Sequence, residues 1–228
     1  ITIACAVAGI VVGTIGQTGV GLQFTESVVG MSNGQLWLAL ILISIAALVL
    51  GMGLPATAAY IVLAVMTGPA LQELGLTLIT AHMIIFWLSQ TSNVTPPIAL
   101  AAFAGAGIAG AQPMRSAVEA FRLASGLFVI PLMMAYSPLL LTGQNSWPDV
   151  LLAGLVTLAL IVAIAMVTTR FLFTQVGNWQ LGLAGLSIVI LVFPSITGRV
   201  AAVGLVMIVA LLNYRRLPDT SERSKTPA

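Results

Sequence analysis

Two short stretches combine glycine or proline with small polar residues inside runs that are otherwise apolar: Gly51-Met52-Gly53-Leu54-Pro55 and Ser92-Asn93-Val94-Thr95-Pro96-Pro97. Glycine frees the backbone, and proline removes an amide donor and forces the residue before it out of the helical region, so both stretches predict a broken helix. A break surrounded by hydrocarbon persists where protein, water or a bound ion satisfies the freed carbonyl and amide groups. These two breaks are therefore the candidate functional site.

The chemistry available at the breaks is the binding of a hard monovalent cation by oxygen atoms. Carboxyl ends of helices attract a cation, and hydroxyl and backbone oxygens coordinate it without an acidic side chain. We expect the bound cation to be Na⁺, with no other cofactor or metal. Two other interpretations stay open, a plain proline kink at the first break and helix-capping hydroxyls at the second. The residues expected to bind the ion are Gly51, Met52, Gly53, Thr57, Ser92, Asn93, Thr95 and Pro96.

The composition is that of an integral membrane protein. Hydrophobic residues make up 59% of the 228 residues and charged residues 6%, whereas soluble domains carry about 25% charged residues. The sequence has no charged residue between Glu26 and Glu73 or between Glu73 and Arg115. The absence of paired carboxylates, a nucleophile elbow and a His-Glu-x-x-His motif argues against an enzyme, and the basic residues indicate topology rather than nucleic-acid binding.

The expected fold class is all-α: a polytopic transmembrane helical protein with a discontinuous helix and a re-entrant hairpin. A span needs about 20 residues, because the hydrocarbon core is about 30 Å thick. The two arms Thr80 to Ser92 and Ile98 to Gly110 are too short to cross singly and are expected to form the re-entrant hairpin. The expected spans are Ile3 to Val20, Leu36 to Gly68 with a break at Gly51 to Pro55, Leu123 to Leu141 and Val150 to Thr169.

The domain organisation follows from these spans. Residues 1–141 are expected to form one region, with the broken helix at 51–55 and the hairpin at 80–110. Residues 142–216 are expected to add transmembrane helices, and residues 217–228 to be a disordered tail. Within the second region, Leu181 to Phe193 and Val200 to Tyr214 are either one kinked span or an out-and-back pair, and the distribution of positive charge favours the pair.

The remaining polar residues give weaker signals. His82 is the sole histidine, and its position near the start of a hairpin arm is typical of an interfacial side chain rather than a proton relay. Arg115, Glu119 and Arg122 share one face of a helix and are expected to act as solvated anchors.

Several motifs resemble one transporter family. These are Leu50 to Ala64, Ala81-His82, Thr95 to Ala102, Ala109 to Arg115 and Glu119 to Leu123. Together they resemble the large membrane subunit of the tripartite ATP-independent periplasmic (TRAP) transporters, and in particular the C-terminal half of fused 4TM/12TM permeases that work with TAXI-type binding proteins. The resemblance covers roughly Ile1 to Leu141, and the chain is accordingly interpreted as a fragment.

The resemblance implies a Na⁺-coupled secondary transporter for organic acids in a bacterial or archaeal cytoplasmic membrane, with Na⁺ as the coupling ion. It also implies that residues 1–141 are half of the transport domain. Its implied partners are a TAXI-type periplasmic binding protein, the first half and small-subunit region of the same permease, membrane lipid and an organic acid. One residue departs from the pattern, because dicarboxylate-type relatives tend to place an Asp where this chain has Pro55. A non-transporting membrane scaffold or assembly subunit remains the alternative, and the orientation in the membrane stays open.

Overall fold

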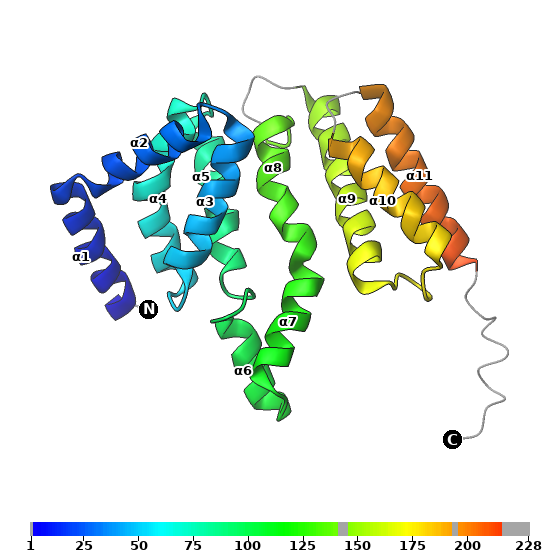
Figure 1. The fold of residues 1–228 in the computed structure, drawn as a ribbon, viewed down its shortest axis with the longest axis horizontal. Coiled ribbons are helices and arrows are strands. Elements are labelled where there is room, and N and C mark those ends of the chain that lie inside the picture. Colours follow the sequence, from blue (N-terminus) through cyan, green and yellow to red (C-terminus); the bar gives the residue numbers. More distant parts are fainter. Residues whose placement is uncertain (1, 141–145, 193–195, 216–228) are drawn as a thin grey trace. The chain divides into compact units, whose positions relative to one another are not determined.

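The structure is a computed structural model that describes residues 2–140, 146–192 and 196–215, with the backbone alone at residues 4, 5, 192, 196 and 197. Within these ranges all regular elements are helices, apart from one isolated bridge between Phe171 and Gln175 (Figure 1). The all-α fold class is confirmed. The chain divides into two compact units, Ile1–Val150 and Leu151–Ala228. The expected domain boundary at 141/142 and the expected tail at 217–228 lie outside the described residues.

The first unit begins with two helices that meet at a sharp bend. Helix α1 (Thr2–Thr18) matches the expected first span, and α2 (Val20–Ser32) follows it at an angle of 72°. Gly19 makes this bend possible because its φ of +69° lies in the left-handed region, which glycine adopts without steric cost. The polarity of α2, which carries Gln23 and Glu26, is the reason the apolar pattern did not predict a helix there.

The first expected break is present, but the chain reverses at it. Helix α3 (Leu36–Gly51) and α4 (Ala56–Glu73) pack against each other, so the two arms form a helical hairpin with its tip at residues 51–55. The expectation of one discontinuous helix over residues 36–68 is therefore wrong. Length explains the difference, because each arm has at least 16 residues and can fold back on the other.

The second expected break is also present, but here the chain does not fold back. Helix α5 (Leu78–Thr91) packs on α3, α4 and α8, whereas α6 (Leu100–Ala109) packs on α7 (Pro113–Leu123), and α5 and α6 do not pack against each other. Residues 80–110 are therefore a discontinuous helix and not the expected hairpin. The chain turns back after α6, at Gly110, whose φ is +63° (Figure 1). The hairpin and the discontinuous helix both exist, with their positions exchanged.

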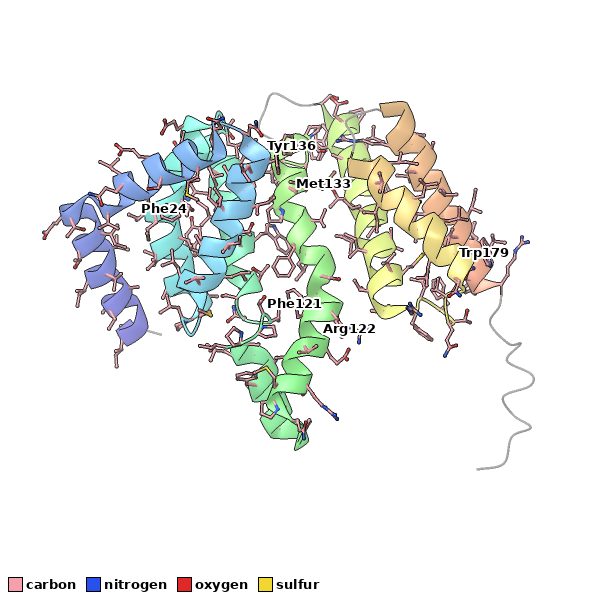
Figure 2. The ribbon with its side chains drawn as sticks, in the orientation of Figure 1. Phe24, Phe121, Arg122, Met133, Tyr136 and Trp179 are labelled. Carbon is pink, nitrogen blue, oxygen red and sulfur yellow. The ribbon has the colours of Figure 1, made fainter. Side chains whose placement is uncertain are left out.

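The return path is longer than the expected span at residues 123–141. Helix α7 continues through a 3-10 turn, η1 (Ala124–Phe128), into α8 (Val129–Tyr136), and together they form an apolar run of 24 residues, Pro113–Tyr136. Figure 2 places Phe121 and Arg122 on this run, and the Phe121 ring lies 5.4 Å from the Phe128 ring. Glu119 and Arg122 form an ion pair at 3.0 Å on α7, as the anchor interpretation expects.

The core of the first unit lies between the hairpin and α5. Its fully buried side chains come from α3, α4 and α5, and within a membrane these helices are held together by close van der Waals packing rather than by removal of apolar surface from water. These side chains are Ile43, Leu63, Leu71, Ile84, Ile85 and Leu88.

The second unit contains α9 (Trp147–Thr169, which begins just before it), α10 (Asn178–Val192) and α11 (Ile196–Tyr214). Helix α9 agrees with the expected span at residues 150–169. Helices α10 and α11 pack side by side, so the out-and-back pair is present rather than one kinked span (Figure 1). In the described part of the chain, Pro113–Tyr136 and Trp147–Thr169 are each long and apolar enough to cross a membrane, and the bent α1–α2 pair is a third candidate.

Candidate functional site

The hairpin tip is a tight turn between two helix ends. Gly51 is buried at the carboxyl end of α3, and its carbonyl accepts a hydrogen bond from the amide of Leu54 at 3.3 Å. Gly53 is exposed with a φ of +78°, a left-handed backbone conformation that residues with a Cβ rarely adopt. Pro55 then precedes α4 with φ −58°, close to the value its ring imposes. The glycines and the proline therefore end one helix and begin the next within five residues.

The second break is a series of turns over the carboxyl end of α5. The amide of Asn93 donates to Gln90 and the amide of Val94 donates to Thr91, each at 3.2 Å. The carbonyl of Asn93 then accepts the amide of Ala101 from the first turn of α6, also at 3.2 Å. This bond joins the break to the start of α6 and keeps the two halves of the discontinuous helix connected.

The two breaks meet at Gly51 and Ser92. A Cβ added to Gly51 would lie 2.9 Å from the Cβ of Ser92 and 3.0 Å from its Oγ, so the backbone of α3 touches the last turn of α5. Both helices present their carboxyl ends at this contact. Because each end carries a partial negative charge of about half an elementary charge, the meeting point favours a cation.

Hydroxyl groups line the end of α5, and each donates a hydrogen bond to a backbone carbonyl of the preceding turn. Ser92 Oγ donates to the carbonyl of Ser89 at 2.9 Å, Thr91 Oγ1 donates to Leu88 at 2.8 Å, and Thr95 Oγ1 donates to Thr91 at 2.6 Å. A hydroxyl that has donated its hydrogen keeps its oxygen lone pairs as acceptors. Ser92 is 3% exposed and Thr91 is 1% exposed, so this oxygen-rich surface is removed from bulk solvent.

The expected ion-binding residues occupy two sides of the tip. Gly51 and Ser92 are brought together, and Met52, Asn93, Thr95 and Pro96 lie half-buried in the two turns beside them. Thr57 is exposed in the first turn of α4, on the amino-end side of the tip rather than at the meeting carboxyl ends. Across the described ranges, no group of three or more His, Cys, Asp or Glu side chains could hold a metal ion.

One contact near the site was not anticipated from the sequence. Tyr60 Oη on α4 and His82 Nδ1 on α5 are 2.9 Å apart, and the Tyr60 ring makes an edge contact with Phe86. The two residues are 22 positions apart. No periodicity or motif pairs them, and only the packing of the hairpin against α5 brings them within hydrogen-bond distance.

The chain was compared with protein families, curated proteins and solved structures. No curated protein and no solved structure matches it. A family model described as "Tripartite ATP-independent periplasmic transporter, DctM component" matches residues 1–144. The matched range includes the hairpin tip and the discontinuous helix. Since the match spans more than half of the chain, this membrane protein belongs to the DctM component family of the tripartite ATP-independent periplasmic transporters.

Proposed function

We propose that the chain forms part of the permease of a Na⁺-coupled secondary transporter that takes up organic acids through a cytoplasmic membrane. The observation that supports this proposal is the contact between Gly51 and Ser92, which joins the carboxyl ends of α3 and α5 beside donated hydroxyls. Two helix ends and several neutral oxygens suit a weakly held monovalent ion such as Na⁺, because binding must be reversible for transport.

The amino ends at the same breaks suit the negative charge of a carboxylate. Helix α4 begins directly after the tip and α6 begins directly after the second break, and no side chain caps either amino end by a hydrogen bond. Free amides at a helix amino end attract anions. A cation and a carboxylate bound at opposite helix ends would each favour binding of the other, which is the physical basis of symport.

Family membership supports a periplasmic substrate-binding protein and a small membrane subunit as partners. We further propose that the binding protein is of the TAXI type and that the first half of a fused permease completes the transporter. Pro55 stands where dicarboxylate-type relatives tend to carry an Asp, so a side-chain carboxylate is missing from the tip. The proposal therefore assigns ion binding to backbone and hydroxyl oxygens.

Thermal unfolding of the purified protein in Na⁺, K⁺ and choline tests the cation site. Bound Na⁺ should stabilise the fold by about 2.7 kcal/mol at a concentration one hundred times its Kd, and K⁺ and choline should stabilise it less. Ser92→Ala should remove most of this Na⁺ response, because it deletes the oxygen beside Gly51. Ser44→Ala is the matched control, since Ser44 Oγ also donates to its own helix, at 2.7 Å to Leu40, but lies away from the break.

Equal melting temperatures in the three salts would contradict the proposal and favour the alternative of a membrane scaffold. A Na⁺ response that Ser92→Ala and Ser44→Ala reduce equally would place the ion elsewhere. Uptake of labelled organic acids by cells containing the complete permease and its binding protein tests the substrate class separately.

A further inference from the structure

One end of the second unit carries positive charge, and the residues that the structure describes there include no acid. Arg170 follows the carboxyl end of α9 and Arg215 follows the carboxyl end of α11. The sequence contains no Asp or Glu between Asp149 and Asp219, so the described part of this unit holds arginines as its only charged residues. This region lies outside the family match at residues 1–144.

A buried asparagine holds the two arginine-bearing segments together. Asn213 is fully buried in the last turns of α11, and its Oδ1 accepts the amides of Phe173 and Thr174 at 3.0 Å each. The Phe173 ring also meets the Tyr214 ring edge-on at 5.4 Å. The loop after α9 is thereby fixed on the end of α11. Arg170 begins this loop and Arg215 adjoins the same ring contact, so both arginines belong to one surface.

Neither arginine side chain supports the fold of the described residues. Arg170 and Arg215 are exposed, and neither side chain makes an ion pair or hydrogen bond with the described residues. Arg170 adopts a φ of +54°, a conformation in which a residue with a side chain is strained. Glycine would adopt this φ angle at no steric cost. The backbone conformation therefore does not explain why residue 170 is an arginine.

Exposed aromatic rings lie in the segments next to the two arginines and in the first turn of α10. Phe171, Phe173, Trp179 and Tyr214 are each about half exposed. Figure 2 labels Trp179 at the end of the unit where α10 begins. Aromatic side chains gather at the boundary between hydrocarbon and head groups, where their apolar and polar parts face different solvents. This end of the unit therefore matches the depth at which lipid phosphates lie.

The amino end of α10 lies at the same end. The amide of Gly177, which precedes the helix, donates to Gln180 Oε1 at 3.0 Å, and Gln180 is fully buried. The two guanidinium groups add full positive charges to this surface. Arginine presents a planar set of donors that matches two oxygens of one phosphate.

We propose that Arg170 and Arg215 belong to a surface that binds the phosphate groups of anionic phospholipids of the phosphatidylglycerol class, with the exposed aromatic rings of this end against the glycerol and upper acyl region. Charge complementarity favours this occupant, since the described part of the surface is cationic, has no acid and includes exposed aromatic rings. The site is independent of the proposed Na⁺ site. A variant that loses lipid binding should keep its Na⁺ response, and a variant that loses the Na⁺ response should keep lipid binding.

The test is lipid binding by the full chain, delipidated in a mild detergent and titrated with short-chain phosphatidylglycerol or phosphatidylcholine. Bound lipid is counted by native mass spectrometry. Phosphatidylglycerol should bind more tightly than phosphatidylcholine, and Arg170→Gly and Arg215→Gln should each weaken it about fivefold, which corresponds to about 1 kcal/mol. Arg170→Gly suits the backbone at that position, so a loss of binding with unchanged melting temperature reports the side chain.

Arg115→Gln is the matched control, because it removes one exposed arginine of the first unit that also makes no ion pair with the described residues. It should leave phosphatidylglycerol affinity unchanged. Equal affinity for the two lipids would overturn the proposal, and so would an equal loss in Arg115→Gln, which would indicate non-specific attraction. Displacement of the lipid by inorganic phosphate at the same concentration would assign the site to a soluble anion instead.

Discussion

The two helix breaks of the first unit use similar residues and lead the chain in different directions. At residues 51–55 the chain reverses, and α4 packs back on α3. After α5 the chain turns several times and continues into α6, which packs on α7 instead. The first break has Gly53 at φ +78°, whereas the second has turn hydrogen bonds at Asn93 and Val94 followed by the bond from Ala101 to Asn93.

This difference shows that local composition specifies the end of a helix but not the path that follows. Both breaks stop a helix because glycine and proline weaken or remove its hydrogen bonds. The direction of the next helix depends on which surface it can bury. The long arm α4 buries Leu63 and Leu71 against α3 and α5, whereas α6 is short and rich in alanine and glycine.

The largest effect is expected where the breaks touch. Gly51→Ala should lower the free energy of unfolding by about 1–3 kcal/mol, because its Cβ would lie 2.9 Å from the Cβ of Ser92 and the helix ends must move apart. Gly105→Ala in α6 is the control with the opposite sign. Nothing lies within 4 Å of an added Cβ there, so alanine should stabilise the helix by about 0.5–1 kcal/mol. Thermal unfolding measures both changes in the free energy of unfolding. Equal changes in the two variants would mean that the contact between Gly51 and Ser92 does not determine the cost.

A smaller effect is expected at Gly53, for a different reason. An added Cβ meets nothing within 4 Å, so the cost of Gly53→Val comes from its left-handed backbone and should be about 1–2 kcal/mol. Gly53→Asn should cost less, because asparagine tolerates this conformation. If valine and asparagine prove equally harmful in thermal unfolding, the reversal at the tip does not depend on this φ angle.

The hydrogen bond between the hairpin and α5 should contribute less again. Tyr60→Phe keeps the ring contact with Phe86 and removes the bond to His82, at an expected cost of about 1 kcal/mol. Tyr214→Phe is the matched control, since no hydrogen bond of its hydroxyl is found in the described residues. A double-mutant cycle of Tyr60→Phe with His82→Phe should give a coupling energy of similar size. Zero coupling would mean that the hairpin and α5 are held together by packing alone.

The smallest change in stability is expected at the second break. Thr95→Val conserves volume and removes the bond from Oγ1 to the Thr91 carbonyl, which still accepts the amide of Val94. The expected cost is about 0.5 kcal/mol. The Na⁺-dependent shift in melting temperature should fall much more, because an oxygen ligand is lost. A full Na⁺ response in this variant would exclude Thr95 from the proposed cation site.

Much of the fold was predictable because membrane helices obey simple rules. Long runs without charge predicted α1 and α9, and the out-and-back pair α10–α11 was favoured by the placement of positive residues. Helix α2 was missed because its polar residues conceal a helix that packs on α3 and α4. The positions of the hairpin and of the discontinuous helix were predicted the wrong way round. The arms of a helical hairpin and the halves of a discontinuous helix have the same helical periodicity and a similar composition, so the sequence pattern does not distinguish them.

The candidate site was predictable as two separate breaks and not as one place. The sequence alone determined that helices end near Gly51 and Ser92, because glycine and proline act on their own backbone and that of the preceding residue. Tertiary structure decided that α4 folds back on α3, that Gly51 touches Ser92 and that Tyr60 reaches His82. These contacts join residues far apart in the chain, and they depend on which helix surfaces bury one another, a property that no local pattern encodes.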